Sequence, residues 1–438
     1  MRFFVYLTLL IGLTALHIGT LPSALAQSNL EVDGRRLNET MSAMKTFGGT
    51  PEGGSIRVAY SDSNKAALEY LDGLMREAGL ATHIDAAGNL VGRREGNSNN
   101  LAPIVTGSHI DTVPNGGHYD GIVGVMSAIE VARTLHEQSV SLRHPVEFVV
   151  WSNEEGGKTG SRAVAGAVKS AEFALPSLGE RSLGEGMQFL GGDPAALESV
   201  RRNKGDIAAY LELHIEQGAI LDRKNIAIGV VEGIVGIRRW NVTVDGFANH
   251  AGTTPMDQRS DALYTAARFV TLVRDSITEI PGTQVGTVGR IEAFPGAPNV
   301  VPGQATMSLE IRDLSMDKVG LLFDRIARAS EILAKETGAK ISFVQFYESM
   351  AAPTNEAIRK IIEGSTESLG LSYQRMPSGA GHDAQSLGTI CPIGMIFVPS
   401  RDGTSHAPSE FTSPQQITDG ANVLLRTLLG VDAQMDND

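Results

Sequence analysis

The stretch APIVTGSHIDTVPNGGHYDGIVGVMSAIEVARTLHEQ, residues 102–138, places three kinds of sequence in order. It begins with a short apolar run, which predicts a buried strand over 102–109. A loop rich in glycine and in potential metal ligands follows, and residues 121–138 then show the apolar spacing of a helix. A strand that leads through a loop into a helix is the building unit of an α/β fold.

Strands and helices continue to alternate on both sides of this stretch. Helical spacing appears at 64–80, and the apolar run at 144–151 predicts another buried strand. The segment 206–218 is expected to be a strand, or a helix that passes into one. This alternation predicts an α/β catalytic domain with a mainly parallel central sheet and helices on both faces.

From about residue 236 the order of the elements changes. The apolar patterns predict strand, helix, strand, strand, helix and strand, which is the split β-α-β unit of a four-stranded domain. After residue 350 the first style returns. We therefore predict a catalytic domain over 27–235 and 351–438, interrupted over 236–350 by a small α+β (βαββαβ) domain.

Length and charge limit the classes of function. The 438 residues exceed one ordinary hydrophobic core, so two domains are expected. The formal net charge of −13 argues against a nucleic-acid partner, because binding to phosphates needs a clustered basic surface. The composition fits a soluble protein that acts on a small molecule.

The first residues, MRFFVYLTLLIGLTALHIGTLPSALAQ (1–27), resemble a secretory signal. We expect cleavage after Ala26 and a periplasmic or secreted protein without stable membrane insertion. The alternative is that the segment is kept as a membrane anchor. Since Cys391 is the only cysteine, no intramolecular disulfide can form after export.

Residues that bind metals follow the buried strands. His109 ends the strand of the opening stretch, Glu154 and Glu155 follow the next strand, and His214 lies in the segment 206–218. In an open α/β sheet such residues meet beyond the carboxyl ends of the strands. The further candidates lie in loops: Asp111, Asp120 and His406.

Imidazole and carboxylate ligands without a thiolate suit Zn²⁺, Mn²⁺, Co²⁺ or Ni²⁺. Asp120 could bridge two ions, since each carboxylate oxygen can bind one of them. Asp111 would orient His109 through the second ring nitrogen. Of Glu154 and Glu155, one could bind metal while the other acts as general base.

Each candidate also has an ordinary structural explanation. A histidine after a strand is more often hydrogen-bonded within the core, and NEEGG (153–157) is typical of a solvated turn. His118, in the glycine-rich loop, has no expected role. The joint occurrence of ligand-type residues after consecutive strands leaves a metal site and a purely structural explanation evenly matched.

A larger set of motifs resembles a known family. The chain is similar to the M20 metallopeptidase-like amidohydrolases, and more closely to their hydantoinase/carbamoylase branch. The motifs cover nearly the whole mature chain, and HIEQG and GAGHDAQ favour this branch over the peptidases. In order they are GSHIDTVPNGGHYDGIVGV, NEEG, ELHIEQG, NHAGTTPMDQRSDA, APNVVPG, EIRD, SGAGHDAQ and SHAPSE.

By this resemblance, His109 and His214 complete one metal site, Glu155 and His406 complete the other, and Asp120 bridges them. Two divalent ions per subunit are implied; we expect Zn²⁺ first, with Mn²⁺, Co²⁺ or Ni²⁺ as alternatives.

The resemblance also implies the catalytic and substrate-binding residues. Glu154 would be the general base. His250 would stabilise the oxyanion, reaching the partner subunit's site in a homodimer formed through the inserted lid domain. The implied substrate contacts are Asn299 and Arg312 to a carboxylate, Gln217 and His382 to the ureido or amide group, and the backbone at Gly381.

The implied reaction is hydrolysis of the carbamoyl C–N bond of N-carbamoyl-L-amino acids, which releases the amino acid, CO₂ and ammonia. The alternatives are an allantoate amidohydrolase, a β-ureidopropionase, a dipeptidase or aminoacylase of the wider family, and a binding protein that has lost its metals. One departure concerns the pocket wall: after NEEG this branch often continues SRF, whereas this chain has GKTGSRAVAG (157–166).

Overall fold

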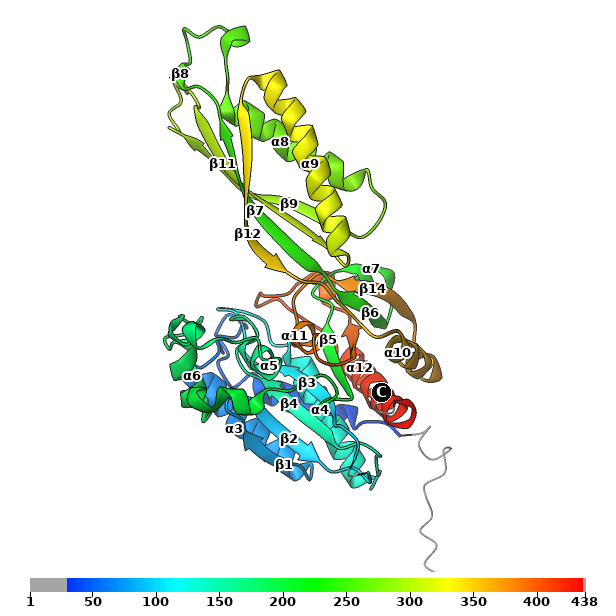
Figure 1. Ribbon diagram of the computed structural model, residues 1–438. Coiled ribbons are helices and arrows are strands. Elements are labelled where there is room, and N and C mark those ends of the chain that lie inside the picture. The colour runs from blue at the N-terminus through cyan, green and yellow to red at the C-terminus, as the bar shows by residue number, and fades with distance from the viewer. Residues whose placement is uncertain (1–29, 99, 436–438) are drawn as a thin grey trace, which may run out of the picture. The chain divides into compact units, whose positions relative to one another are not determined.

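The strand and helix of the opening stretch are β3 (Ile104–His109) and α4 (Ile122–Glu137) (Figure 1). The computed structural model describes residues 30–98 and 100–435, so the expected signal segment lies outside it. All of β3 and nearly all of α4 are buried. A Cβ at Gly124 would meet the carbonyl oxygen of Leu213, so glycine there lets α4 pack closely on the sheet.

These elements belong to a nine-stranded sheet. Its central strands β4, β3, β5 and β15 are parallel. The predicted α/β fold with a mainly parallel centre is confirmed, while antiparallel pairs flank this centre. Short connections such as the turn between β1 and β2 allow only antiparallel pairing. The order is β1 (Ala81–Ile84), β2 (Leu90–Arg94), β4 (Val146–Trp151), β3, β5 (Ala209–Ile215), β15 (Ile393–Val398), β6 (Ile228–Ile234) and β13 (Ala352–Pro353), with β14 (Tyr373–Ser378) on β6.

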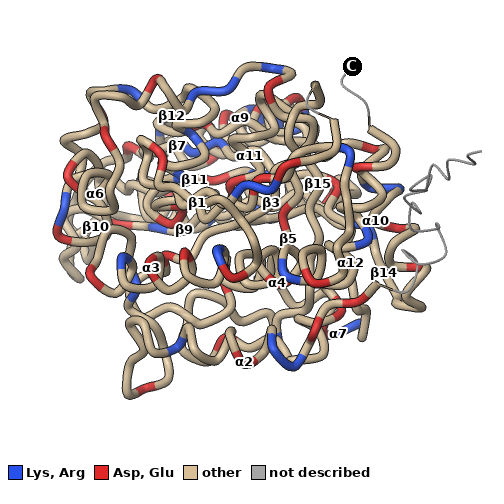
Figure 2. Tube along the Cα trace, turned by 90° about the horizontal axis from the view of Figure 1, so that it is seen from below, with Lys and Arg blue, Asp and Glu red and all other residues tan. Residues whose placement is uncertain are grey.

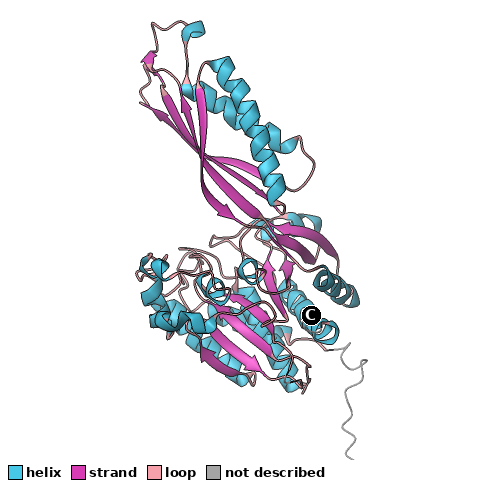
Figure 3. Ribbon diagram, in the orientation of Figure 1, coloured by secondary structure: helices cyan, strands magenta, loops and turns pink. Residues whose placement is uncertain are grey.

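Helices cover both faces of this sheet, as predicted (Figure 3). On β15, Met395 and Phe397 belong to the core cluster that includes Leu387 of α11. Val398 instead faces α12, where it would contact a Cβ at Gly420. The helices are α2 (Gly34–Met44), α3 (Asp62–Glu77), α5 (Thr159–Val164), α6 (Leu183–Leu190), α7 (Ile220–Lys224), α10 (Glu356–Ser368), α11 (Asp383–Leu387) and α12 (Pro414–Gln434).

The β-α-β-β-α-β order predicted after residue 236 is also confirmed. It forms a second, antiparallel sheet with its own core around Trp240, Phe269 and Met307. A short pair, β8 (Asn249–His250) and β10 (Val300–Val301), lies beside it. The elements are β7 (Gly236–Asp245), α8 (Ala262–Thr278), β9 (Val285–Phe294), β11 (Gln304–Asp313), α9 (Met316–Thr337) and β12 (Lys340–Ser349), with strands in the order β12, β7, β11, β9.

The division into domains over 27–235, 236–350 and 351–438 stays a prediction.

Lys and Arg residues are interspersed with Asp and Glu residues along the trace (Figure 2). Among the helices formed by the described residues, none has both the length and the apolar character to cross a bilayer.

Candidate metal and substrate site

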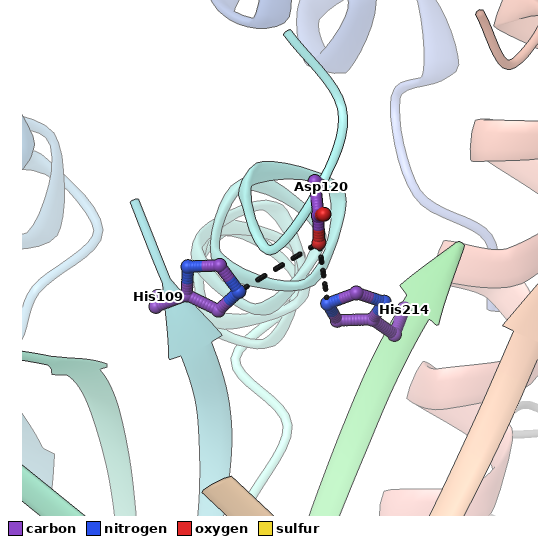
Figure 4. A group of neighbouring side chains, drawn as sticks. All are labelled: His109, Asp120 and His214. Carbon is purple, nitrogen blue, oxygen red and sulfur yellow. Dashed lines mark ion pairs between the residues drawn. The ribbon is translucent and has the colours of Figure 1, made fainter. Parts of the chain in front are cut away.

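Three buried side chains from separate elements meet at the carboxyl ends of the central strands (Figure 4). His109 ends β3, His214 lies near the end of β5, and Asp120 comes just before α4. The Oδ1 atom of Asp120 lies 3.1 Å from Nε2 of His214 and 3.8 Å from Nε2 of His109. These atoms are close enough together to hold one cation.

The second carboxylate oxygen of Asp120 serves another group. Its Oδ2 atom lies 3.0 Å from Nε2 of His406, and that nitrogen lies 3.4 Å from Oε1 of Glu155. This group also has the spacing of possible metal ligands. Asp120 therefore offers one oxygen to each group, the arrangement expected of a bridging carboxylate.

Gly121 allows the turn between Asp120 and α4. Its φ is +68°, in the left-handed region that favours glycine. A Cβ at this position would lie 2.5 Å from the ring of His109. Both the turn and the close approach to His109 therefore need a glycine.

Asp120 is held by a residue to which the sequence prediction gave no role. Oε1 of Glu410 accepts hydrogen bonds from the backbone N–H groups of Tyr119 (2.8 Å) and Asp120 (3.0 Å). Ser405 donates to Oε2 of Glu410 and to Oδ2 of Asp120. Glu410 is the last residue of the SHAPSE motif, so its place in that motif could have indicated a role at the site.

Asp111 meets the second ring nitrogen of His109, as predicted, but through its backbone. Nδ1 of His109 lies 3.0 Å from the backbone carbonyl oxygen of Asp111, whereas the carboxylate is 3.8 Å away. That carboxylate instead accepts the backbone N–H groups of Glu154 (3.2 Å) and Glu155 (3.1 Å). The loop after β3 directs the carbonyl, not the side chain, towards the ring. Asp111 thus positions the loop that carries both glutamates.

Glu154 and Glu155 occupy different places at this site. Oε2 of Glu154 lies 3.9 Å from Nε2 of His109, while Glu155 lies beside His406. Burial raises the pKa of both carboxyl groups, and repulsion by Asp120 adds to the effect. Glu154 therefore has the environment of a proton-transfer group.

The donor set fits two divalent cations. It contains imidazoles and carboxylates without thiolate, and one carboxylate is shared between the groups. Burial, with repulsion between the carboxylates, raises the pKa of Glu154 and Glu155, and cations would offset this cost of burying negative charge. A third group, Glu212 with His214 and His382, is less suited, because Glu212 already accepts from Ser108 and from the backbone of Ala384.

The two groups open into a cavity of about 380 Å³. His382 is buried behind it, and its Nε2 lies 2.8 Å from Oγ of Ser378. His118 is buried and does not line the cavity. The predicted site residues in its wall are His109, Asp120, Glu154, Glu155, His214, Gln217, Arg312, Gly381 and His406.

The structure does not bring His250 and Asn299 into this cavity. His250 is exposed, and its Nδ1 accepts the backbone N–H of Gly252. Asn299 accepts the N–H of Ala251 through its carbonyl. Both lie beyond the far end of β7, a strand of 10 residues, which spans about 30 Å. Their predicted roles remain predictions.

Comparisons with known proteins agree on one group of enzymes. The model of peptidase family M20/M25/M40 matches residues 105–430. The N-carbamoyl-L-amino acid amidohydrolase of Geobacillus stearothermophilus is 37% identical over 402 residues, which are 91% of this chain and 98% of that protein. The allantoate amidohydrolase of Escherichia coli is 33% identical, over 89% and 95% of the two chains. The structure of a hydantoinase/carbamoylase family amidase from Burkholderia multivorans has a TM-score of 0.85 and 33% identity, over 92% and 99% of the chains.

Proposed function

Because the chain belongs to peptidase family M20/M25/M40 and is a hydrolase of C–N bonds in linear amides, we propose that it hydrolyses N-carbamoyl-L-amino acids. The products are the L-amino acid, CO₂ and ammonia. The observation that carries the proposal is the set of residues that line one cavity: Glu154, the two histidine–carboxylate groups and the guanidinium of Arg312. It thus combines a proton-transfer group with an anchor for a carboxylate.

Two divalent cations per subunit are part of this proposal. His109, His214 and Asp120 would hold one, and Asp120, Glu155 and His406 the other. Zn²⁺ suits these ligands, and Mn²⁺, Co²⁺ or Ni²⁺ are alternatives. Such ions polarise a substrate carbonyl and make hydroxide available at neutral pH.

Glu154 moves the proton. Its carboxylate accepts a proton from the attacking water, and the carboxyl group then donates it to the leaving nitrogen. Burial supports this role, since it raises the pKa of Glu154 from the usual range of a glutamate. Asp111 keeps the residue in place through the backbone N–H of Glu154.

The wall residues offer unused polar groups to the substrate. Nε2 of Gln217 donates to Asp120, while its buried Oε1 has no hydrogen-bond partner within residues 30–98 and 100–435. A ureido N–H would satisfy this oxygen. Arg312 donates from Nε to Glu310 and from Nη1 to the carbonyl of Gly379. Its Nη2 remains for the substrate carboxylate, with Gly381 of the cavity wall beside the ureido group and His382 behind that wall.

We extend the proposal to the remaining predicted features. His250 and Asn299 would reach a catalytic cavity in a homodimer, or after the inserted domain closes, and His250 would then stabilise the oxyanion. The support is their location outside the cavity of their own chain. We also propose export to the periplasm or medium, from the sequence of residues 1–26.

Allantoate is the second candidate substrate. Relatives from Bacillus subtilis and Escherichia coli are named allantoate amidohydrolases. Allantoate carries a ureido group and a carboxylate, so the same anchors would serve it. N-carbamoyl-β-alanine and dipeptides are the more distant alternatives.

A substrate screen tests the proposal. Ammonia release would be measured with N-carbamoyl-L-amino acids, allantoate and N-carbamoyl-β-alanine, and amino-acid release with dipeptides, after chelation and after addition of Zn²⁺, Mn²⁺, Co²⁺ or Ni²⁺. We expect the highest kcat/KM with an N-carbamoyl-L-amino acid, and only with added metal. Higher kcat/KM for allantoate would favour the second candidate. Full activity after exhaustive chelation would contradict the metal assignment.

Glu154→Gln tests the proton-transfer role. Its amide cannot accept the proton, so we expect kcat to fall by about 10²- to 10⁴-fold. Metal content and melting temperature of the variant serve as controls, and both should match the wild type. A variant with full kcat would show that another group is the base.

A further inference from the structure

The near end of the inserted sheet forms one wall of the cavity. Here β7 begins while β11 and β12 end. Residues two positions apart on a strand point to the same face, so alternate positions of the three strands share this wall. Two cross-strand rows result: Ile237 pairs with Ser349 and Arg312, and Arg239 pairs with Tyr347 and Glu310.

Two arginines in these rows share one carboxylate. Nε of Arg312 donates to Oε1 of Glu310 (2.6 Å), and Nε of Arg239 donates to Oε2 (2.5 Å). These hydrogen bonds outweigh burial and lower the pKa of Glu310, so it is ionised at neutral pH. One negative charge therefore faces two guanidinium groups, and the wall keeps a net positive charge.

Arg239 has donors to spare. Its guanidinium lies 4.8 Å from the centre of the Tyr347 ring, which limits its rotation. Among the described residues, only Glu310 accepts a hydrogen bond from it, through Nε, so both terminal nitrogens are available. Arg239 lines the cavity together with Arg312.

A third cation enters the cavity from a different element. Lys158, in the segment that departs from the usual family sequence, also lines it. Its φ of +57° is in the left-handed region, and its Nζ donates to Oε1 of Gln385. Within 4.0 Å it has no carboxylate partner among the described residues. The cavity wall thus carries more cationic side chains than one substrate carboxylate requires.

We propose that Arg239 binds a second carboxylate of the substrate, so that the enzyme prefers N-carbamoyl derivatives of L-glutamate and L-aspartate. The inference rests on the proposed function. In it, Arg312 binds the α-carboxylate and Arg239 the side-chain carboxylate, while Lys158 adds to the positive potential. Arg239 and Arg312 are diagonal neighbours on adjacent strands, with about 7–8 Å between such positions. Two long arginine side chains at this spacing can reach both ends of a dicarboxylate.

Matched substrates isolate the effect of the charge. N-carbamoyl-L-glutamate and N-carbamoyl-L-glutamine have nearly the same shape and differ by one negative charge, as do the aspartate and asparagine derivatives. For the wild type we expect kcat/KM to favour the acidic member by about tenfold to a hundredfold, the range of one or two charge-assisted hydrogen bonds. The preference should shrink at high salt.

Variants of neighbouring arginines assign the effect to Arg239. Arg239→Met should bring the ratio of kcat/KM for glutamate over glutamine close to one, because kcat/KM falls much more for the glutamate derivative than for the glutamine derivative. Arg239→Lys should keep part of the preference, since lysine keeps the positive charge but lacks the planar guanidinium that donates two parallel hydrogen bonds to a carboxylate. Arg238→Met is the control: Arg238 directly precedes Arg239 in β7, points to the opposite face and pairs with Glu348. It should leave the ratio unchanged.

The outcomes separate this inference from the proposed function. Equal kcat/KM for the acidic and neutral derivatives in the wild type would overturn the inference and leave the function standing. The same holds if Arg239→Met lowers both values equally. Absence of hydrolysis of any N-carbamoyl-L-amino acid, including the methionine derivative, would overturn both.

Discussion

Asp120 can face both groups of candidate metal ligands because its neighbours fix both its backbone and its side chain. Glu410 accepts the backbone N–H of Asp120, and Gln217 and Ser405 donate to its Oδ2 atom. A bridging carboxylate must keep each oxygen directed at one ion. Residues outside the two groups of candidate ligands should therefore determine how well a metal site forms.

Glu410→Ala should weaken metal binding. It removes the acceptor for two buried backbone N–H groups and frees the loop that carries Asp120. We expect metal affinity to fall by about 10- to 100-fold, as for other residues that hold a ligand in place. Competition with a chromophoric chelator measures the affinity. Glu410→Gln is the control, since its carbonyl oxygen can still accept both bonds; equal affinity of the Ala variant and the wild type would contradict the role.

Gly121→Ala should disrupt His109 directly. The new Cβ would lie 2.5 Å from the His109 ring, so the ring must move. We expect metal content and kcat/KM to fall together. Gly53→Ala is a matched control: Gly53 also has a positive φ, of +84°, but has nothing within 4 Å of its would-be Cβ. Both variants place a Cβ-bearing residue at a positive φ, and only Gly121→Ala should lose metal.

At the scale of elements, ion pairs fasten α10 to its neighbours. Glu356, at the start of α10, accepts from Arg359 in the same helix and from Arg375 of β14. Arg375 also pairs with Glu363, about two turns further along the same face of α10. Among the described strands, β14 pairs with β6 alone, so these ion pairs help to hold β14 and α10 on the sheet.

The contribution of Glu356 should depend on pH. Hydrogen bonds from Arg375 and Arg359 lower its pKa from 4.5 to about 2. A lowered pKa means that the stabilisation is complete above pH 4.5 and is lost as the pH falls towards 2. We expect wild type and Glu356→Gln to differ in unfolding free energy at pH 6, and the difference to shrink between pH 4.5 and pH 3. Denaturant titrations at several pH values measure it; a constant difference would contradict the assignment.

At the scale of the whole molecule, two predicted catalytic-site residues lie outside the cavity of their own chain. His250 and Asn299 are carried by the short β8–β10 region, not by the sheet ends that form the site. The inserted sheet also has an edge strand, β9, with exposed apolar side chains such as Ile291. An unpaired edge of this kind readily joins a second copy of the chain.

The proposed homodimer should therefore be sensitive to charge on β9. We expect light scattering after size exclusion to give twice the monomer mass for the wild type, and a lower mass for Ile291→Lys. Ile332→Lys, which changes an exposed isoleucine on α9, is the matched control and should remain dimeric. A monomeric wild type would exclude this arrangement. In that case, His250 could act only through closure of the inserted domain.

Local pattern was sufficient for the elements and for much of the site. Apolar periodicity predicted β3, α4 and the βαββαβ insertion, because burial of one helix face or of a whole strand requires that spacing. Residues directly after buried strands, such as His109 and Glu154, could be placed near one another because parallel strands end at the same edge of a sheet.

Other features depend on contacts between residues far apart in the chain, and no local pattern records them. Glu410 lies 290 positions from Asp120, the residue whose backbone it holds. The Asp111 carboxylate binds the glutamate loop, while its backbone carbonyl faces the His109 ring, because the path of the loop after β3 sets which oxygen meets the imidazole. The sharing of Glu310 by Arg239 and Arg312 depends on the register of β7 against β11. Spacing along the chain thus determines which residues reach the site, while packing across it decides which atoms meet there.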